Sequence, residues 1–214
     1  KPQTFTLTVA GSGKTLALDS DYTVTYLNNV YAGTATIVIT GKGNYCGEIK
    51  KQFTILAKSF DDASIKLADI PTQIHTGAEL VPAVVMTDGE AVLLLNRDYL
   101  VTYENNTAIG TAHVIVSGIG DYSGVKETSF DIIANSNFFT AKEISDVTYS
   151  TTEFTPLPEI SYANVVLENG KDYTLSYANN TDAGIATITV TGQGAYSGIV
   201  LNVNFSILAK SISD

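Results

Sequence analysis

Residue types that build catalytic or disulfide-stabilised sites are scarce in this 214-residue chain, which has one cysteine, one methionine, two histidines and no tryptophan. The single cysteine, Cys46, cannot form a disulfide within the chain, so packing must stabilise the fold. Catalytic triads and most zinc sites need histidine, and only His75 and His113 are present. We therefore expect no enzyme activity, no catalytic or metal-binding residues, and no cofactor.

Basic residues are also few. The chain has 12 Lys and Arg against 22 Asp and Glu, which gives a formal net charge of -10. Affinity for nucleic acid and for anionic membranes comes mainly from Lys and Arg, so neither is an expected partner. No apolar run approaches the roughly 20 residues of a membrane span. No signal peptide opens the sequence, and we expect no membrane insertion by this segment.

The chain does contain an internal repeat, a feature that must be recognised before any fold is inferred. Three stretches match, and the first reads DYTVTYLNNVYAGTATIVITGKGNYCGEIKKQFTILAKS; we call them the first, second and third blocks, at residues 21–59, 98–136 and 172–211. Their leading tyrosines lie 77 residues apart (99 minus 22) and then 74 apart (173 minus 99). The third block has one extra residue between Gly198 and Phe205, which predicts either a bulge or a longer turn.

A weaker match precedes two of the blocks, because residues 75–89 align with residues 149–163. The first block has no such front segment. We therefore expect its sheet to expose an unpaired edge and part of its core, unless a strand from Lys1 to Val9 fills that place. Both ends of the chain resemble cuts through a longer array. The sequence predicts three repeats, the first without its front third, at residues 1–57, 58–134 and 135–214.

The hydrophobic period within each block is two. In the first block, Ala35, Ile37 and Ile39 share one face while threonines share the other, and the later blocks repeat this pattern. A pair of asparagines and then a Gly-x-Gly triplet separate the strands, and both can supply the positive φ angles of tight turns. Short strands at this spacing predict an all-β fold of roughly six- or seven-stranded sandwiches. Because the joints between repeats are short, we expect an elongated rod.

The blocks share the pattern DYxVTYxNNxxAGTAxVxVTGxGxYxGxxxxxFxI, which resembles the Ig-like tandem repeats of long surface proteins of Gram-positive anaerobic bacteria. The resemblance implies tandem Ig-like β-sandwich repeats at the bacterial cell surface, outside the cell. It also implies a structural role, as spacer or stalk repeats of a secreted or cell-wall-attached protein such as an adhesin. It supplies no catalytic residue and names no ligand.

A binding module for a glycan or an extracellular protein is the alternative function. Nine of the twelve tyrosines recur at equivalent places in the three blocks, which favours a packing role for them. Aromatic residues outside that pattern are better candidates for ligand contact, because binding residues usually depart from the scaffold. These candidates are Tyr31, Tyr149, Tyr162, Phe138 and Phe139.

Two short motifs suggest ion or nucleotide binding but have simpler explanations. Gly11-Ser12-Gly13-Lys14-Thr15 ends like a phosphate-binding loop, yet a strand pattern follows it where such a loop needs a helix. Asp61-Asp62 at the first joint offers calcium its preferred oxygen ligands, but the dense spacing of a calcium loop is absent. We expect a turn at the first motif and a solvated linker at the second.

The histidines and the cysteine also fit the repeat pattern. His75 aligns with Tyr149, so we expect it to occupy the same packing position. His113 lies on the threonine face of its strand and should face solvent. Cys46 takes a turn position that is serine in the other blocks, so we expect an exposed free thiol there.

Overall fold

The structure is a computed structural model that describes residues 5–213. Within this range, strands are the only secondary-structure elements longer than a single helical turn. The outermost residues of the predicted first and third repeats, 1–4 and 214, lie outside the described range. Two single-turn 3-10 segments, η1 (Ser136–Phe138) and η2 (Gly194–Tyr196), are the helical elements found between residues 5 and 213. The prediction of an all-β fold is confirmed.

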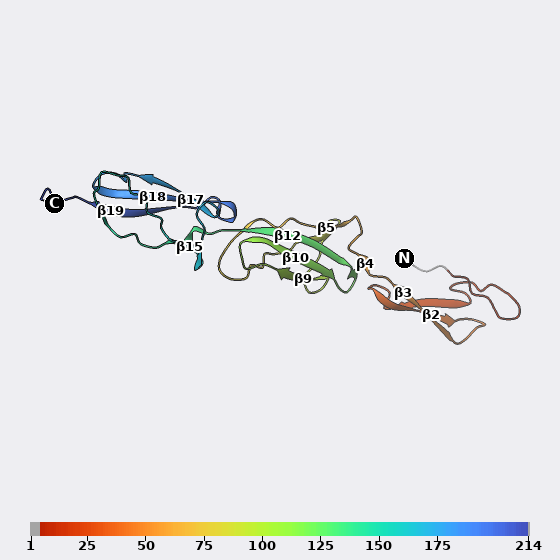
Figure 1. Cartoon of the computed structure of the whole chain (residues 1–214). Helices are drawn as coiled ribbons and strands as arrows, with labels where there is room; N and C mark the ends of the chain where they lie inside the picture. Colours follow the sequence, from red (N-terminus) through yellow and green to blue (C-terminus); the bar gives the residue numbers. More distant parts are fainter. Residues whose placement is uncertain (1–4, 214) are drawn as a thin grey trace. The chain divides into compact units, whose positions relative to one another are not determined.

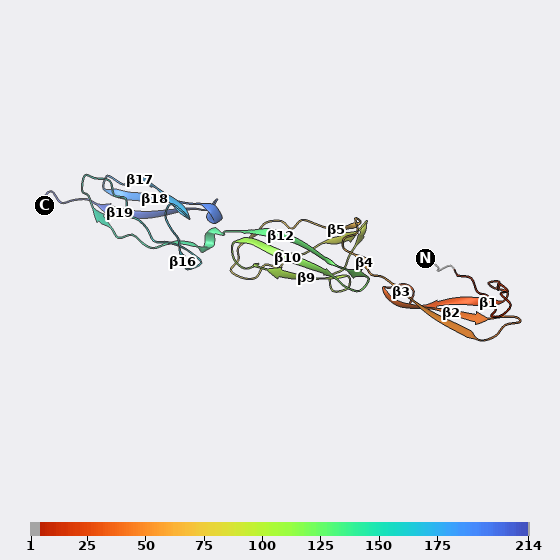
Figure 2. The ribbon, with the colours of Figure 1, turned by 45° about the vertical axis from the view of Figure 1, so that its right-hand side comes forward.

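The first and third blocks form the same antiparallel ladder. Their strands lie side by side in both ribbon views (Figure 1, Figure 2), and they are β1 (Tyr22–Leu27), β2 (Gly33–Gly41) and β3 (Glu48–Ile55), then β17 (Tyr173–Ala178), β18 (Gly184–Gly192) and β19 (Val200–Leu208). Tyr22 pairs with Gly41, and the equivalent Tyr173 pairs with Gly192. The register is therefore the same in both ladders, which is what one buried face per strand demands.

The second block forms a corresponding sheet from β9 (Tyr99–Glu104), β10 (Gly110–Gly118) and β12 (Val125–Ile133). The front segments add a parallel strand to the outer edge of the later two sheets. These added strands are β6 (Gln73–Ile74), which pairs with β12, and β14 (Val147–Thr148), which pairs with β19. Each of these two sheets is consequently four-stranded.

The front segments also form three-stranded sheets of their own. One contains β5 (Ile65–Leu67), β7 (Met86–Asp88) and β8 (Ala91–Val92), and the other contains β13 (Phe139–Ala141), β15 (Ile160–Tyr162) and β16 (Val165–Val166). The short strands β4 (Lys58–Ser59) and β11 (Tyr122–Ser123) pair in parallel. Asp88 lies opposite Ile65 and Tyr162 lies opposite Phe139, so Asp88 and Tyr162 hold the same position in their sheets.

The third block packs as two layers around one hydrophobic core. Buried side chains of β18 and β19 meet buried side chains of β13 and β15, and they include Ile188, Val190, Phe205, Phe139 and Ile160. Alternate residues of each strand point into this core while threonine and asparagine face solvent. This arrangement is the sandwich that the period-two pattern predicts.

The first block has a smaller core, formed by Tyr22, Ile37 and Ile39. Residues 5–16 fold as a hairpin that covers part of it, because Leu7 and Leu16 pack there and Thr8 bridges Thr15. Within residues 5–213, no further strand pairs with the outer edge of β3. The predicted open edge is therefore present, and residues near the chain start supply part of the cover.

Turn residues follow the predicted chemistry. The first asparagine of each pair has a positive φ, 54° at Asn28 and 55° at Asn179. In the Gly-x-Gly triplets, however, only the second glycine does, with φ of 64° at Gly120. The first glycine is required for space: a Cβ at Gly118 would lie 2.7 Å from the Ser123 nitrogen. The triplet thus supplies its positive φ angle at the second glycine, as expected, and the first glycine is kept for a different reason.

The extra residue of the third block lengthens a turn. Gly41 donates to the Gly47 carbonyl in the first block, whereas Gly192 donates to the carbonyl of Ile199, the residue just before β19. The Ile199 side chain is buried. The longer turn, rather than a bulge, accommodates the insertion and adds a side chain to the core.

The chain divides into two compact units. One comprises residues 1–68, 85–101 and 115–126, and the other comprises residues 69–84, 102–114 and 127–214. Strands of the second block continue from one unit into the other. The three repeats with boundaries after residues 57 and 134 stay a prediction, as does the rod.

Candidate ligand-binding site

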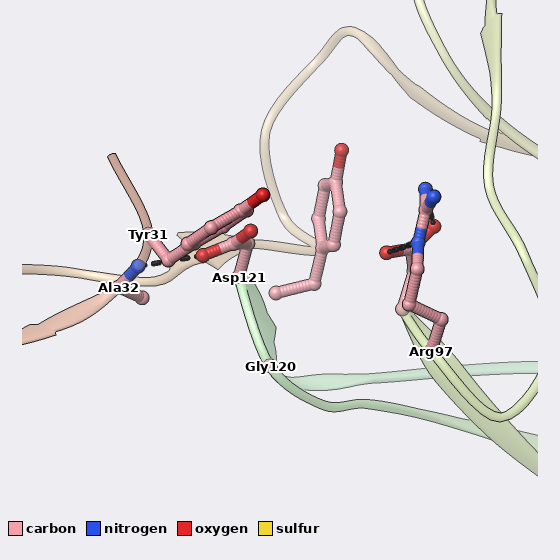
Figure 3. Close-up of a pocket in the computed structure, with 7 residues that line it drawn as sticks. Tyr31, Ala32, Arg97, Gly120 and Asp121 are labelled. Atoms are coloured by element: carbon pink, nitrogen blue, oxygen red, sulfur yellow. Dashed lines mark hydrogen bonds and ion pairs between the residues drawn. The ribbon is translucent and has the colours of Figure 1, made fainter. Parts of the chain in front are cut away.

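One hollow in the first unit combines aromatic rings, carboxylates and a guanidinium group. Its volume is about 580 Å³, and seven residues line it: Tyr31, Ala32, Arg97, Asp98, Gly120, Asp121 and Tyr122. Figure 3 shows Tyr31 and Arg97 on opposite sides of the site, with Asp121 beside Tyr31. Of the predicted ligand-contact residues, Tyr31 alone lies in this hollow. Its side chain is 70% exposed, an unusual state for so large a ring.

Arg97 is fixed by a two-point contact with Asp98. The guanidinium Nε lies 2.9 Å from Asp98 Oδ1, and a terminal nitrogen lies 2.7 Å from Oδ2. Asp98 is 5% exposed and also accepts a hydrogen bond from the Leu94 backbone N–H. The hydrogen bonds from Arg97 hold the pKa of Asp98 below its usual value, and they raise the pKa of Arg97. Both groups are therefore charged at neutral pH, in a planar pair of fixed orientation.

Asp121 is held against the first block. Its Oδ1 accepts a hydrogen bond of 2.6 Å from the Ala32 backbone N–H, drawn as a dashed line in Figure 3. The preceding Gly120 has a positive φ, and a Cβ there would lie 3.1 Å from the Arg97 carbonyl oxygen. Glycine at this position lets the turn carrying Asp121 approach Arg97 closely.

Tyr122 joins the hollow to a neighbouring polar cluster. Its ring lies 6.0 Å from that of Phe60, and its hydroxyl donates to Asp88 Oδ2 at 3.4 Å. Burial raises the pKa of Tyr122, and the nearby Asp88 carboxylate raises it further. The Tyr122 ring is thus packed against Phe60, and its phenol stays protonated at neutral pH.

The polar cluster is centred on Lys58 in β4. Its Nζ lies 2.6 Å from Asp88 Oδ1, 2.8 Å from Ser64 Oγ and 3.9 Å from Asp62 Oδ1. The hydrogen bond to Asp88 raises the pKa of Lys58, and the same bond lowers the pKa of Asp88. Asp62 accepts two hydrogen bonds from Ser64, which lower its pKa. These carboxylates already have partners, so the geometry does not offer them jointly to calcium.

Four predicted ligand-contact residues lie in a different place, in the second unit. Phe139 and Tyr162 are buried in the core of the third block, while Phe138 and Tyr149 are half-buried against it. Ligand contact by all five candidates stays a prediction. For Tyr162 and Phe139 such contact would require the core to open, because their rings are only 4% and 5% exposed.

Tyr162 belongs to a buried group with His75. Its hydroxyl lies 2.7 Å from His75 Nδ1 and accepts a hydrogen bond of 3.1 Å from the Asn135 backbone N–H. The His75 ring lies 4.8 Å from that of Phe138, and the Asn135 amide donates to the His75 carbonyl. His75 therefore packs in the protein interior, as its alignment with Tyr149 predicts.

The remaining motifs have structural roles. The Gly11 to Thr15 string is a turn between the bridged residues Thr8 and Thr15, and the structure assigns no helix after it. His113 and Cys46 are exposed, as expected. In the part of the chain that the structure describes, no group of three His, Cys, Asp or Glu residues could hold a metal ion. No helix among residues 5–213 is long and apolar enough to cross a membrane.

Sequence reasoning missed three residues of the hollow. Tyr122 was assigned to packing because it recurs as Tyr45 and Tyr196. Arg97 and Asp121 were missed although neither residue is repeated: the equivalents are Ser20 and the basic Lys171 for Arg97, and Asn44 and Ala195 for Asp121. Arg97 is also the only arginine in the chain. A search for residues that differ between the blocks at equivalent positions would have found Arg97 and Asp121, had it included charged residues as well as aromatic ones.

Comparison with known proteins adds little to this picture. No protein-family model matches the chain, and no curated protein matches its sequence. Among solved structures, the chain is similar to the protocadherin gammaB7 EC3-6 cis-dimer structure, with 12% sequence identity, a TM-score of 0.23, and coverage of 94% of this chain and 68% of that chain. So low a TM-score supports no conclusion about fold or function.

Proposed function

We propose that this chain is a structural spacer, made of Ig-like stalk repeats in a secreted or cell-wall-attached bacterial surface protein of the adhesin type. The observation that carries the proposal is the identical register of the first and third ladders, built by equivalent residues. A protein that repeats a scaffold without adding catalytic groups gains length, which is what a stalk supplies.

Repeated bonds support the same proposal: one kind occurs in all three blocks and another in the later two. The carboxylates of Asp21, Asp98 and Asp172 each accept a hydrogen bond from the backbone N–H four residues earlier. Tyr103 and Tyr177 each donate to a proline carbonyl of their own front segment. Residues that recur for these reasons hold the scaffold.

Force spectroscopy on the whole chain tests this proposal. If the three repeats unfold one at a time, the trace should show three increments of roughly 200 to 290 Å of extended chain. Small-angle scattering should give an elongated particle. A single cooperative unfolding event together with a globular scattering profile would refute the spacer.

Surface location requires its own test. Antibodies raised against the purified chain should label intact cells of the source bacterium without permeabilisation. Labelling that requires permeabilised cells would contradict the extracellular assignment while leaving the mechanical result untouched.

The alternative, a module that binds a glycan or an extracellular protein, is favoured by one specific observation. The hollow beside Tyr31 contains exposed aromatic surface together with fixed polar groups, which is the usual composition of a ligand site. A spacer can carry such a site, so the two functions are compatible.

A further inference from the structure

We propose that the hollow lined by Tyr31, Arg97, Asp121 and Tyr122 binds a neutral carbohydrate. This inference rests on the binding alternative above and is independent of the spacer function. It assigns a ligand class to one site, from the ring surfaces, the fixed donors and acceptors, and the local charge.

The aromatic surface comes from two tyrosines in different blocks. Tyr31 follows the asparagine pair of the first block and is 70% exposed, while Tyr122 lies in β11 and is packed against Phe60 on one side. A sugar ring has an apolar face of C–H groups that can cover such a ring and remove it from water. Both tyrosines line the same hollow, so one ligand can contact both.

The polar groups supply both halves of a hydrogen-bonding pattern. A sugar hydroxyl donates one hydrogen bond and accepts others. Asp121 offers acceptors. Its Oδ1 accepts a hydrogen bond from the Ala32 N–H, and its second carboxylate oxygen can accept one from the ligand. Arg97 offers donors, because Asp98 engages one edge of its guanidinium and the side chain is 66% exposed.

These polar groups are already held in place before any ligand arrives. Arg97 is held by two hydrogen bonds to a buried carboxylate, and Asp121 is held by a backbone N–H. A ligand therefore meets a preorganised donor and acceptor, which reduces the entropic cost of binding.

Charge selects against acidic ligands. The hollow contains one positive group, Arg97, and two negative groups, Asp98 and Asp121, a sum of +1 - 2 = -1. The whole chain has a net charge of -10. Phosphorylated, sulfated and acidic sugars are disfavoured by this field, and neutral sugars are not.

The third block provides an internal comparison. The residues that hold the turn are kept there, because Asp172, Gly194 and Tyr196 are equivalent to Asp98, Gly120 and Tyr122. At the corresponding positions of the second and third blocks, Ala108 of the second block replaces Tyr31, and Lys171 and Ala195 of the third block replace Arg97 and Asp121. The scaffold is thus repeated, while the tyrosine, the planar guanidinium and the carboxylate occur together once.

Glycan binding by the whole chain provides the test. An immobilised array of neutral and acidic oligosaccharides identifies the probe, and saturation-transfer NMR with the best neutral oligosaccharide then measures affinity. We expect binding to neutral glycans, and Tyr31→Ala and Arg97→Ala should each weaken it about tenfold or more. Lys171→Ala, at the position equivalent to Arg97, should leave affinity unchanged.

Several outcomes would overturn the inference. They are no binding to any neutral glycan, binding to acidic glycans only, or binding that survives both Tyr31→Ala and Arg97→Ala. Capture of a proline-rich peptide or a folded protein by the same residues, without glycan binding, would replace carbohydrate with a protein partner. The spacer proposal is judged separately, since the number of unfolding events in force spectroscopy does not depend on the ligand.

Discussion

Removing one hydroxyl group from the core of the third block should cost more stability than its size suggests. In Tyr162→Phe the ring remains, so packing against Phe139 and Tyr196 is preserved. Two partners lose their hydrogen bond: the His75 Nδ1 atom, which is buried, and the Asn135 backbone N–H, which is half-buried. A buried polar group left without a partner costs about 1–3 kcal/mol. Since Asn135 is partly solvated, we expect a total loss of about 1.5–3 kcal/mol.

A neighbouring tyrosine gives the matched control. The Tyr196 ring lies 5.2 Å from that of Tyr162, and its hydroxyl makes no side-chain hydrogen bond among residues 5–213. Tyr196→Phe should therefore change the free energy of unfolding by less than about 0.5 kcal/mol. The two variants remove the same atom from the same aromatic group, and only the hydrogen bonds differ.

Urea unfolding followed by tyrosine fluorescence measures both variants, and amide hydrogen exchange localises the effect. Tyr162→Phe should lower the midpoint and speed exchange at Asn135, whereas Tyr196→Phe should do neither. Equal effects of the two substitutions would show that the Tyr162 hydroxyl contributes nothing beyond ring packing. The stabilising effect expected of the hydrogen bonds to His75 and Asn135 would then be refuted.

Three further predictions concern the rest of the chain. Gly118→Ala should destabilise the second block by about 2 kcal/mol or more, because the new Cβ would lie 2.7 Å from the Ser123 nitrogen, and an unchanged thermal midpoint would contradict this. Since the pKa of Asp98 is lowered in the folded state, its contribution is present above the unfolded value near about 4 and is lost as pH falls through the folded value; urea midpoints measured down that range should fall less in Asp98→Asn. Outward-facing amides of β3 should exchange faster than those at Ile132 and Ile133 in β12, whose edge is paired with β6, and equal protection would argue against the open edge.

Repetition made the fold predictable. A period of two fixes which side of each strand is buried, and three copies of one pattern remove the ambiguity that a single short strand would leave. The front segments were harder to place, because β5, β6 and their counterparts are only two or three residues long. Strands this short carry too few side chains to show a period, and their pairing depends on contacts distant in sequence.

The candidate site was predictable only in part. Tyr31 could be found because the other blocks have no aromatic residue at its position, and it is exposed as a binding residue should be. The same rule selected Tyr162 and Phe139, which are buried instead. They differ from their counterparts Asp88 and Ile65 because the two front sheets pack against different neighbours, so unrepeated residues arise from packing as well as from binding.

The two equivalent positions occupied by Asp88 and Tyr162 have a consequence for how the protein meets its surroundings. Asp88 attracts Lys58 by charge, and dissolved salt weakens such an attraction. Tyr162 is surrounded by aromatic rings and bonded to His75, and the hydrophobic part of this packing weakens on cooling. The two equivalent positions are thus stabilised by different forces: added salt should weaken the contact at Asp88, and cooling should weaken the packing at Tyr162.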